Sequence, residues 1–317
     1  MSVASRYQVE VALPSRAELG EGPTWDDRTQ SLLWVDIVAG RVHRFRPDLG
    51  TDVAADVGST LGAVGLRAGG GLVLALADGL GLASAGQVRA ALPGDARRPD
   101  PGGRHAGVAL GYERVGGFAV DGDAVRFNDG KADPEGRFLA GTMHWHERDA
   151  LGTLYQLEPG GQVSRLLENV TVSNGLDVSD DRRTLYYVDS RQGGIDAFDR
   201  DPGTGRLSGR RRVAEVPGAD GVPDGMTLDS EGCLWVAVWG AGQVRRFTPG
   251  GRLIGVVEVP AAQVSSVAFG GARLDELFIT TARIGQPSPA LAAQPRAGDL
   301  FWCQPGVSGR LPFRFAG

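Results

Sequence analysis

Short apolar strands alternate with polar or glycine-rich turns along the whole chain. Each unit has a polar or glycine-rich entry, a short apolar strand, a turn and a second strand rich in β-branched and aromatic residues. The unit occurs six times, at residues 20–37, 61–76, 126–143, 173–190, 223–238 and 265–281. Helical periodicity is weak everywhere and reaches its clearest case at 289–294. The pattern predicts an all-β chain.

The spacing of the six units predicts their arrangement. Equivalent positions are Glu21, Gly62, Asn128, Asn174, Asp224 and Ser266, which are 41, 66, 46, 50 and 42 residues apart. Spacings of roughly 40 to 50 residues with four short strands each are typical of propeller blades. We therefore expect residues 1–317 to form a single six-bladed β-propeller with four antiparallel strands per blade. The one long interval predicts a loop insertion at about 93–117, between the second and third blades, which could overhang the pocket.

Two strand-like segments at the ends of the chain have no partner in these six units. They are residues 7–11 and 298–303. We expect them to share a blade and close the ring, because closure removes sheet edges that could pair with other chains.

Composition and charge narrow the function. The 49 glycines among 317 residues indicate many tight turns. A net charge of −5 and the absence of a basic stripe argue against nucleic-acid binding. No apolar run approaches ~18 residues and no signal-peptide pattern begins the chain, so we expect no membrane association. Cys233 and Cys303 lie in apolar runs, which predicts buried free thiols and a cytoplasmic location.

Three polar residues begin innermost-strand units in different blades. Glu21, Asn174 and Asp224 would all point toward the axis once the ring closes. Two carboxylates and one amide oxygen suit Ca²⁺, Mg²⁺ or Mn²⁺, and the lack of His or Cys argues against an obligate zinc site. The alternative for a lone Asn-Gly or Asp-Gly is a simple turn. The equivalent positions of the three residues favour a cation site over simple turns.

A second group of polar residues lies in the third unit. Arg126 and Asn128 alternate with Phe127, so on a strand both face the channel, where they could bind a polyhydroxylated substrate. A structural salt bridge is the alternative for Arg126. Asp129 and Lys131, the only lysine of the protein, are expected to pair with each other.

Other polar residues receive structural interpretations. Asp133, Asp177 and Asp229 are expected to form turns between strands. His144 and His146 flank Trp145 and would share one face of a strand. Two histidines could contribute to a transition-metal site, but we favour histidines that line the pocket.

Several motifs together resemble those of a known family. They stand in the same order and approximate spacing at residues 20–23, 126–131, 141–143, 173–177, 223–226 and 268–271. The chain resembles the senescence-marker-protein/gluconolactonase family of regucalcin-like sugar lactonases along nearly its whole length. The resemblance implies a six-bladed propeller with one divalent cation at the mouth of its central channel. We expect Ca²⁺ first, with Mg²⁺, Mn²⁺ or Zn²⁺ as alternatives.

The resemblance also implies residue roles. The ligands would be Glu21, Asn174 and Asp224, while Arg126 and Asn128 would contact sugar hydroxyls. The family position that matches His146 is often acidic and helps to bind substrate, so this chain departs from the family there. We keep His146 as a candidate substrate-binding residue.

The expected activity is metal-dependent hydrolysis that opens the ring of a sugar lactone, an aldonolactone or a similar ester. Asp224 is the candidate catalytic residue, alone or together with the cation, for activating water. No Gly-x-Ser-x-Gly elbow supports covalent catalysis. The expected partner is a small-molecule lactone, and the expected state is a monomer or weak homodimer. Two alternatives stay open, namely a binding propeller without turnover and a different metal-assisted reaction, such as phosphotriester hydrolysis or a biosynthetic step.

Overall fold

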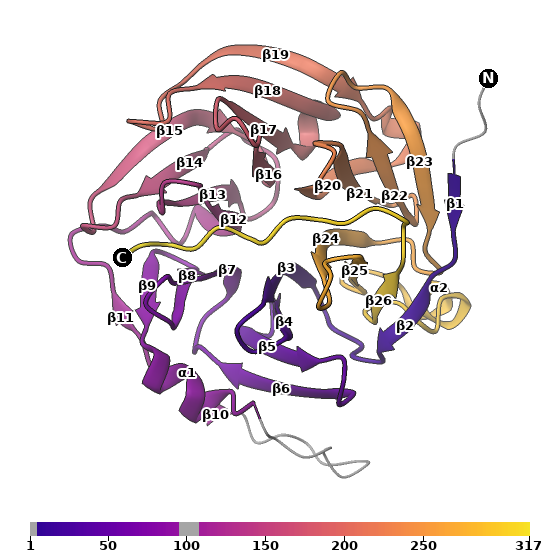
Figure 1. The fold of residues 1–317 in the computed structure, drawn as a ribbon, viewed down its shortest axis with the longest axis horizontal. Coiled ribbons are helices and arrows are strands. Elements are labelled where there is room, and N and C mark those ends of the chain that lie inside the picture. Colours follow the sequence, from indigo (N-terminus) through magenta and orange to yellow (C-terminus); the bar gives the residue numbers. More distant parts are fainter. Residues whose placement is uncertain (1–4, 95–107) are drawn as a thin grey trace.

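The apolar strands predicted from the sequence form six sheets around a central axis (Figure 1). The computed structural model describes residues 5–94 and 108–317. Four consecutive strands alternate in direction in most of the sheets, and the first strand of each lies innermost. The predicted all-β six-bladed propeller is confirmed.

The blades follow the order of the chain. The first contains β3 (Gly20–Asp26), β4 (Ser31–Asp36), β5 (Arg41–Arg46) and β6 (Thr51–Asp56). The second contains β7 (Leu61–Leu66), β8 (Leu72–Leu76), β9 (Leu80–Ala83) and β11 (Glu113–Arg114). The third contains β12 (Val125–Ala132), β13 (Phe138–His144), β14 (Gly152–Leu157) and β15 (Val163–Val170). The fourth contains β16 (Ser173–Val178), β17 (Thr184–Asp189), β18 (Gly194–Arg200) and β19 (Leu207–Glu215).

The last two blades complete the ring. The fifth contains β20 (Val222–Leu228), β21 (Leu234–Trp239), β22 (Gln243–Phe247) and β23 (Leu253–Glu258). The sixth contains β24 (Val264–Gly270), β25 (Glu276–Thr281), β26 (Leu300–Cys303) and β2 (Glu10–Leu13). Because β2 pairs antiparallel with β26, the two ends of the chain share this blade, as the sequence predicted. Short strands β1 (Ser5–Tyr7) and β10 (Val108–Ala109) add parallel edges to the fifth and first blades.

A β-bulge interrupts the innermost strand of every blade. The unpaired positions are Gly22 with Pro23, Gly62, Asn128 with Asp129, Gly175, Asp224 with Gly225, and Ser265. Bulges bend a strand and redirect its side chains, and they are common next to active sites. Here the six bulges lie at equivalent places around the axis, where the sequence predicts the functional site.

The Asn-Gly and Asp-Gly pairs of the site are not turns. They lie inside β16 and β20, and neither glycine has a positive φ. A Cβ on Gly175 would lie 2.5 Å from the carbonyl oxygen of Asp224, and one on Gly225 would overlap the hydroxyl of Ser266. Glycine is required because adjacent innermost strands approach closely at the axis. This observation removes the turn alternative for both pairs.

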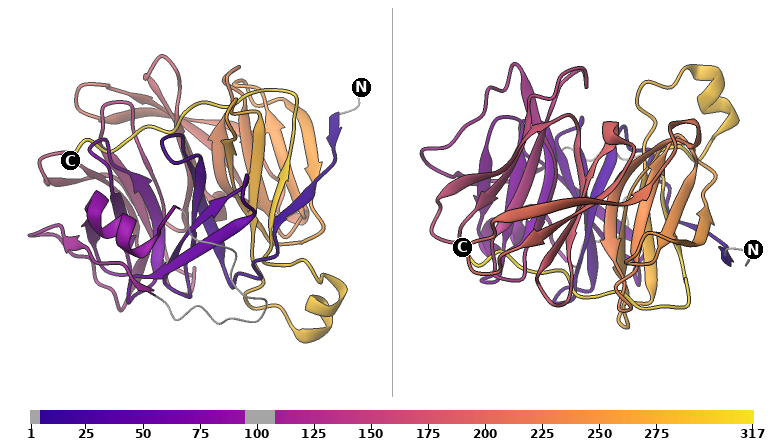
Figure 2. Two further views of the ribbon diagram at one scale, coloured as in Figure 1. Left: turned by 60° about the horizontal axis from the view of Figure 1, so that its bottom comes forward. Right: turned by 90° about the horizontal axis from the view of Figure 1, so that it is seen from above.

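The C-terminal segment, residues 304–317, crosses the opposite end of the channel (yellow in Figures 1 and 2). We call this end the tail face, and the end where the innermost strands begin the site face. Hydrogen bonds join the tail to all six blades, through Ser230, Leu274, Asp177, Asp26, Ala68 and Gly136. The tail therefore closes the channel at its far end and ties the blades together.

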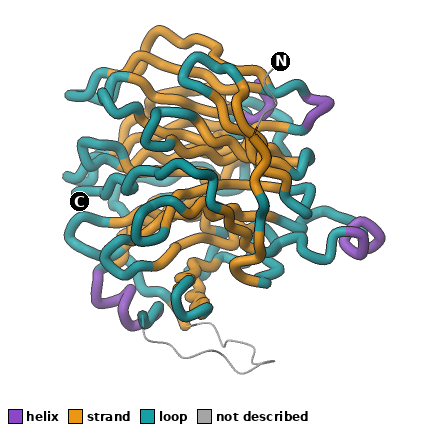
Figure 3. Tube along the Cα trace, turned by 45° about the vertical axis from the view of Figure 1, so that its right-hand side comes forward, coloured by secondary structure: helices purple, strands orange, loops and turns teal. Residues whose placement is uncertain are grey.

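Two helices, α1 (Ala85–Ala91) and α2 (Ser288–Ala293), lie at the periphery of the strand-rich ring (Figure 3). Of the two 3₁₀ turns, η1 (Ser190–Gln192) contacts the innermost strand β20, and η2 (Gly218–Asp220) precedes that strand. The weak periodicity at 289–294 matches α2, whereas α1, which begins with a capping box at Ser84, was not predicted. None of the described helices is long and apolar enough to cross a membrane.

The insertion at 93–117 differs from the expectation. Its residues 95–107 lie outside the described part of the chain. Its later part supplies β11, the outermost strand of the second blade, and β10, an edge strand of the first. Residues 108–114 therefore belong to the outer rim of these two blades, because the second blade takes its fourth strand from the later part of the insertion. The described part does not overhang the pocket.

Two sequence predictions about individual buried groups can be compared with the fold. Cys233 and Cys303 are both buried and free, as predicted.

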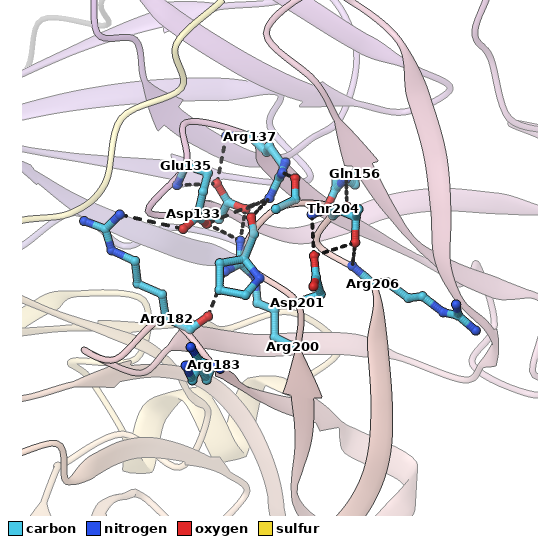
Figure 4. A network of polar contacts seen from close by, with 12 residues as sticks. Asp133, Glu135, Arg137, Gln156, Arg182, Arg183, Arg200, Asp201, Thr204 and Arg206 are labelled. Atoms are coloured by element: carbon cyan, nitrogen blue, oxygen red, sulfur yellow. Dashed lines mark hydrogen bonds and ion pairs between the residues drawn. The ribbon is translucent and has the colours of Figure 1, made fainter.

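Asp133 forms the predicted turn, since one carboxylate oxygen accepts hydrogen bonds from the backbone N–H groups of Glu135 and Arg137. Its other oxygen pairs with Arg137 and with the buried Arg200 of the next blade (Figure 4). Asp133 therefore anchors the third blade to the fourth.

Candidate active site

A chain of hydrogen bonds joins three of the predicted site residues on the site face. Arg126 donates from Nη1 to Oδ1 of Asn128 at 2.8 Å. Asn128 donates from Nδ2 to the carbonyl of Ser173 at 2.9 Å and to Oδ1 of Asn174 at 3.3 Å. Asn174 in turn donates to the hydroxyl of Ser190 at 2.9 Å. These two bonds fix the orientation of the Asn174 side chain, with its amide oxygen directed toward Asn128.

These contacts leave Asn128 little hydrogen-bonding capacity for a ligand. Both protons of its Nδ2 are directed at protein acceptors, and its Oδ1 already accepts one bond from Arg126. Only one lone pair of Oδ1 remains for a ligand. Arg126 differs, because its Nη2 and Nε have no hydrogen-bond partner among residues 5–94 and 108–317. Arg126 is therefore the better candidate for direct substrate binding.

Three buried carboxylates lie close together at the same end of the channel. Burial raises the pKa of Glu21 to about 8, and the negative charge of Asp129 adds to the effect. Burial is also the main cause that raises the pKa of Asp224 well above its usual range, and the charges of Glu21 and Asp129 raise this pKa further. The pKa of Asp129 itself is raised by burial and lowered by Lys131. The charge of Asp129 acts on Glu21, and the charges of both act on Asp224, so the three carboxylates lie near one another.

The carboxylates are poorly compensated by the protein. Glu21 accepts one backbone bond, from Gly22 at 3.0 Å. Within the described residues, Oδ1 of Asp224 is buried without any hydrogen-bond partner. An unpaired buried carboxylate oxygen lowers the stability of the folded protein. Carboxylates that lie close together favour either protonation or a bound cation. This all-oxygen set, with the amide oxygen of Asn174 nearby, fits a hard divalent cation.

Among the described residues, the positive charge of Arg126 acts on Glu21 and that of Lys131 acts on Asp129. Burial lowers the pKa of the Arg126 guanidinium to about 10, while the charges of Glu147, Glu21 and Asp224 oppose that fall. Arg126 remains charged at neutral pH, but the two cations Arg126 and Lys131 cannot balance three carboxylates.

Lys131 and Asp177 form the floor beneath the carboxylates. Lys131 donates to Asp177 at 3.2 Å and to the carbonyl of Met226 at 2.9 Å, so its side chain connects three blades. The other oxygen of Asp177 accepts from Arg310 of the tail at 3.1 Å. The predicted Lys131–Asp129 pair and the predicted turn at Asp177 are therefore wrong. Two cavities of about 30 and 40 Å³ remain at this depth, which is room for only a few waters. A ligand larger than a few waters does not fit at this depth.

The two histidines do not lie on one strand. β13 ends at His144, and His146 is an exposed residue of the following turn. Their rings still touch edge to face, with centroids 5.7 Å apart. His146 is exposed and does not belong to the group of buried carboxylates, and its role in substrate binding stays a prediction. The sequence analysis overlooked the next residue, Glu147, which could have been noticed as a carboxylate directly after the family position that is often acidic.

Another group of potential metal ligands lies on the tail face. Asp229, Glu231 and Cys233 have ligand atoms within 4.8 Å of one another. Both carboxylates are, however, paired with Arg246 at 2.6 Å. Asp229 also accepts from backbone N–H groups in the predicted turn. These oxygens are occupied, so the group does not compete with the site around Asp224.

The fold and the site define a six-bladed propeller with buried carboxylates gathered at one end of a channel that is closed at the other. The chain belongs to the family described as SMP-30/gluconolactonase/LRE-like, whose model matches residues 19–283. Regucalcin of Danio rerio is 37% identical over 317 residues, covering 99% of this chain and 100% of the relative. Regucalcin of Homo sapiens is 36% identical over 325 residues with the same coverage.

Solved structures agree with this assignment. A calcium-binding regucalcin from Agrobacterium tumefaciens superposes with a TM-score of 0.88 at 25% identity, and both chains are fully covered. A luciferin-regenerating enzyme gives a TM-score of 0.84 at 28% identity, with coverage of 98% and 100%. A gluconolactonase from Xanthomonas campestris gives 0.66 at 25% identity, covering 94% of this chain and 89% of the other.

Proposed function

We propose that this protein is a lactonase that uses one divalent cation to open the ring of a sugar lactone or a similar lactone. The observation that carries the proposal is the gathering of Glu21, Asp129 and Asp224, with Oδ1 of Asp224 buried and without a partner. A propeller without a bound cation would gain nothing from this arrangement, because buried like charges destabilise the fold. Membership in a family that includes gluconolactonases supports the reaction.

Glu21, Asn174 and Asp224 are the residues that would hold the cation, and Ca²⁺ is the first candidate because a related structure is described as calcium-binding. A divalent cation in such a site supplies a Lewis acid and lowers the pKa of water. A neighbouring carboxylate then needs only to accept a proton. Asp224 suits that role because its free oxygen faces no protein donor.

Arg126 would orient the substrate with its free Nη2 and Nε donors. A guanidinium offers donors in a fixed plane, which suits adjacent hydroxyls of a sugar ring. Asn128 would act mainly by holding Arg126 and Asn174 in place, since its amide is already engaged. A sugar lactone as the partner and a monomer or weak homodimer as the state remain predictions.

The test is a screen of purified protein against aldonolactones and aliphatic lactones with a panel of divalent ions. Chelation should abolish hydrolysis, and one ion added back should restore it, because the carboxylates would otherwise hold protons. Full activity in the metal-stripped protein would contradict the cation-dependent reaction. Cation binding by calorimetry without turnover of any lactone would instead support the binding propeller.

A further inference from the structure

A cavity of about 520 Å³ lies between the first and sixth blades, apart from the candidate active site. Its walls come from β3 and β5 of the first blade and from β25, β26 and β2 of the sixth, which are neighbours around the ring (Figure 1). Two connections that border it, residues 47–50 and 271–275, join strands on the tail face. Small-molecule pockets in proteins typically measure roughly 300–1,000 Å³. The cavity is therefore large enough for a ligand of its own.

Aromatic side chains from both blades line this cavity. Trp25 and Phe278 stack across the two blades, with ring centroids 6.0 Å apart and ring planes 7° from parallel. Phe45 meets Phe278 edge to face at 6.4 Å. These three rings are buried, whereas Trp302, which pairs with Phe278 in the β25–β26 ladder, is only partly buried. The cavity therefore has firmly packed apolar walls that suit an aromatic or hydrocarbon group.

Glu276 supplies a carboxylate to the same cavity. It lies two residues before Phe278 on β25, so both side chains are on the face of the strand that is turned toward the first blade. Gly271, another lining residue, has a φ of 80°, and a Cβ there would lie 2.8 Å from Cδ of Glu276. The carboxyl group thus packs against bare backbone in the cavity wall.

The charge of Glu276 is not compensated by the protein. It has no hydrogen-bond or ion-pair partner among residues 5–94 and 108–317, whereas the nearby Asp48 pairs with Arg46 at 2.8 Å and Asp275 with Arg273 at 2.7 Å. Burial raises the pKa of Glu276, and the charge of Asp275 adds to this effect, while Arg273 opposes it. A partly buried carboxylate without a partner lowers stability, and a cation bound beside it would offset this loss.

We propose that this cavity binds a small organic cation whose ammonium group pairs with Glu276 and whose aromatic or aliphatic body packs on Trp302 and the neighbouring rings. Aromatic faces attract cations, so the walls favour the charge as well as the body of such a ligand. An anion would be repelled by the carboxylate, and a neutral ligand would leave it unpaired. Binding here does not depend on the proposed lactonase reaction, because the lining residues are separate from those of the candidate active site.

Three probes with one phenyl ring and different charges test the ligand class. They are phenethylammonium, which is the protonated form of phenethylamine at neutral pH, the neutral 2-phenylethanol and the anionic phenylacetate. In calorimetric titrations of the full chain, phenethylammonium should bind about 10-fold more tightly than 2-phenylethanol, and phenylacetate should not bind. Excess Ca²⁺ should leave these affinities unchanged, since the carboxylates of the site face are not involved.

Substitutions in the cavity separate the role of the charge from that of the rings. Glu276→Gln should weaken phenethylammonium binding to the level of 2-phenylethanol, leave 2-phenylethanol binding unchanged and keep the Tm at least as high, because an uncompensated charge is removed. Trp302→Ala should weaken binding of both probes roughly 5-fold, and Trp302→Phe should restore most of the loss. The matched control is Glu168→Gln, which removes an exposed carboxylate paired with Arg165 on the outer strand of the third blade and should change neither affinity.

Each of three results would overturn the proposal. The first is a wild-type protein that binds none of the probes or that binds 2-phenylethanol as tightly as phenethylammonium. The second is a Glu276→Gln protein that keeps the wild-type affinity for phenethylammonium. The third is an affinity for phenethylammonium that falls when Ca²⁺ is added, since this would place the probe among the carboxylates of the site face.

Discussion

Removing the cation should make the stability of this protein fall as pH rises, and Glu21 is the residue to test. Its folded-state pKa of about 8 lies above the ordinary value of 4.5, so between these values the folded protein holds a proton that the unfolded chain has released. Stability must then decrease with increasing pH over that window. Below about pH 4.5 the contribution is fully present, and above about pH 8 it is lost.

The size of the effect follows from the two pKa values. A difference of about 3.5 pH units at about 1.4 kcal/mol per unit gives up to about 5 kcal/mol from Glu21. For a chain of this length the corresponding change in Tm is on the order of 5–10 °C. Asp129 and Asp224 also have raised pKa values and act in the same direction. A bound cation should oppose the fall, since it stabilises the ionised carboxylates and binds more tightly as protons leave.

Thermal unfolding between pH 5 and pH 8, with EDTA or with excess Ca²⁺, measures this dependence. Glu21→Gln keeps the shape of the side chain but cannot ionise, so the difference between the two proteins in EDTA isolates Glu21. The wild-type Tm should fall toward pH 8 more steeply than that of the variant, and Ca²⁺ should raise the wild-type Tm most at pH 8. Parallel curves for the two proteins in EDTA would refute the argument that Glu21 is a buried, uncompensated acid.

Three further predictions concern single side chains. Asp224→Asn should lower kcat by roughly 10²–10⁴ at saturating cation, because the amide cannot accept the proton; near-wild-type kcat with bound metal would remove it from proton transfer. His146→Glu should change relative rates among lactones while Tm changes little; identical substrate profiles would place this exposed residue outside the pocket. Arg310→Ala should weaken substrate or cation binding more than Arg314→Ala, because Arg310 contacts Asp177, the carboxylate that binds Lys131, whereas Arg314 contacts Asp26. Equal effects of the two substitutions on both kinds of binding would show that the tail has only a structural role.

The architecture could be predicted from the sequence because its determinants are local. The six strand pairs are set by alternating apolar residues and by glycine-rich turns within about 20 residues. The repetition of this unit along the chain predicted the ring of six blades. Ring closure is also the reason why we expect Glu21, Asn174 and Asp224 to gather, since equivalent positions of innermost strands face one axis. The glycines after Asn174 and Asp224 were misleading when taken alone, because a close approach between strands and a tight turn select the same residue.

The charged contacts were decided only by the tertiary structure. Arg310 and Asp177 are 133 positions apart, and Lys131 and Met226 are 95 positions apart, yet they meet beneath the site. No short-range pattern identifies such partners, because an arginine or lysine can pair with any of the 38 acidic residues that the fold brings near. The sequence alone predicted which residues begin the innermost strands, and the packing of six blades and the tail determined which charges of the described residues remain unpaired.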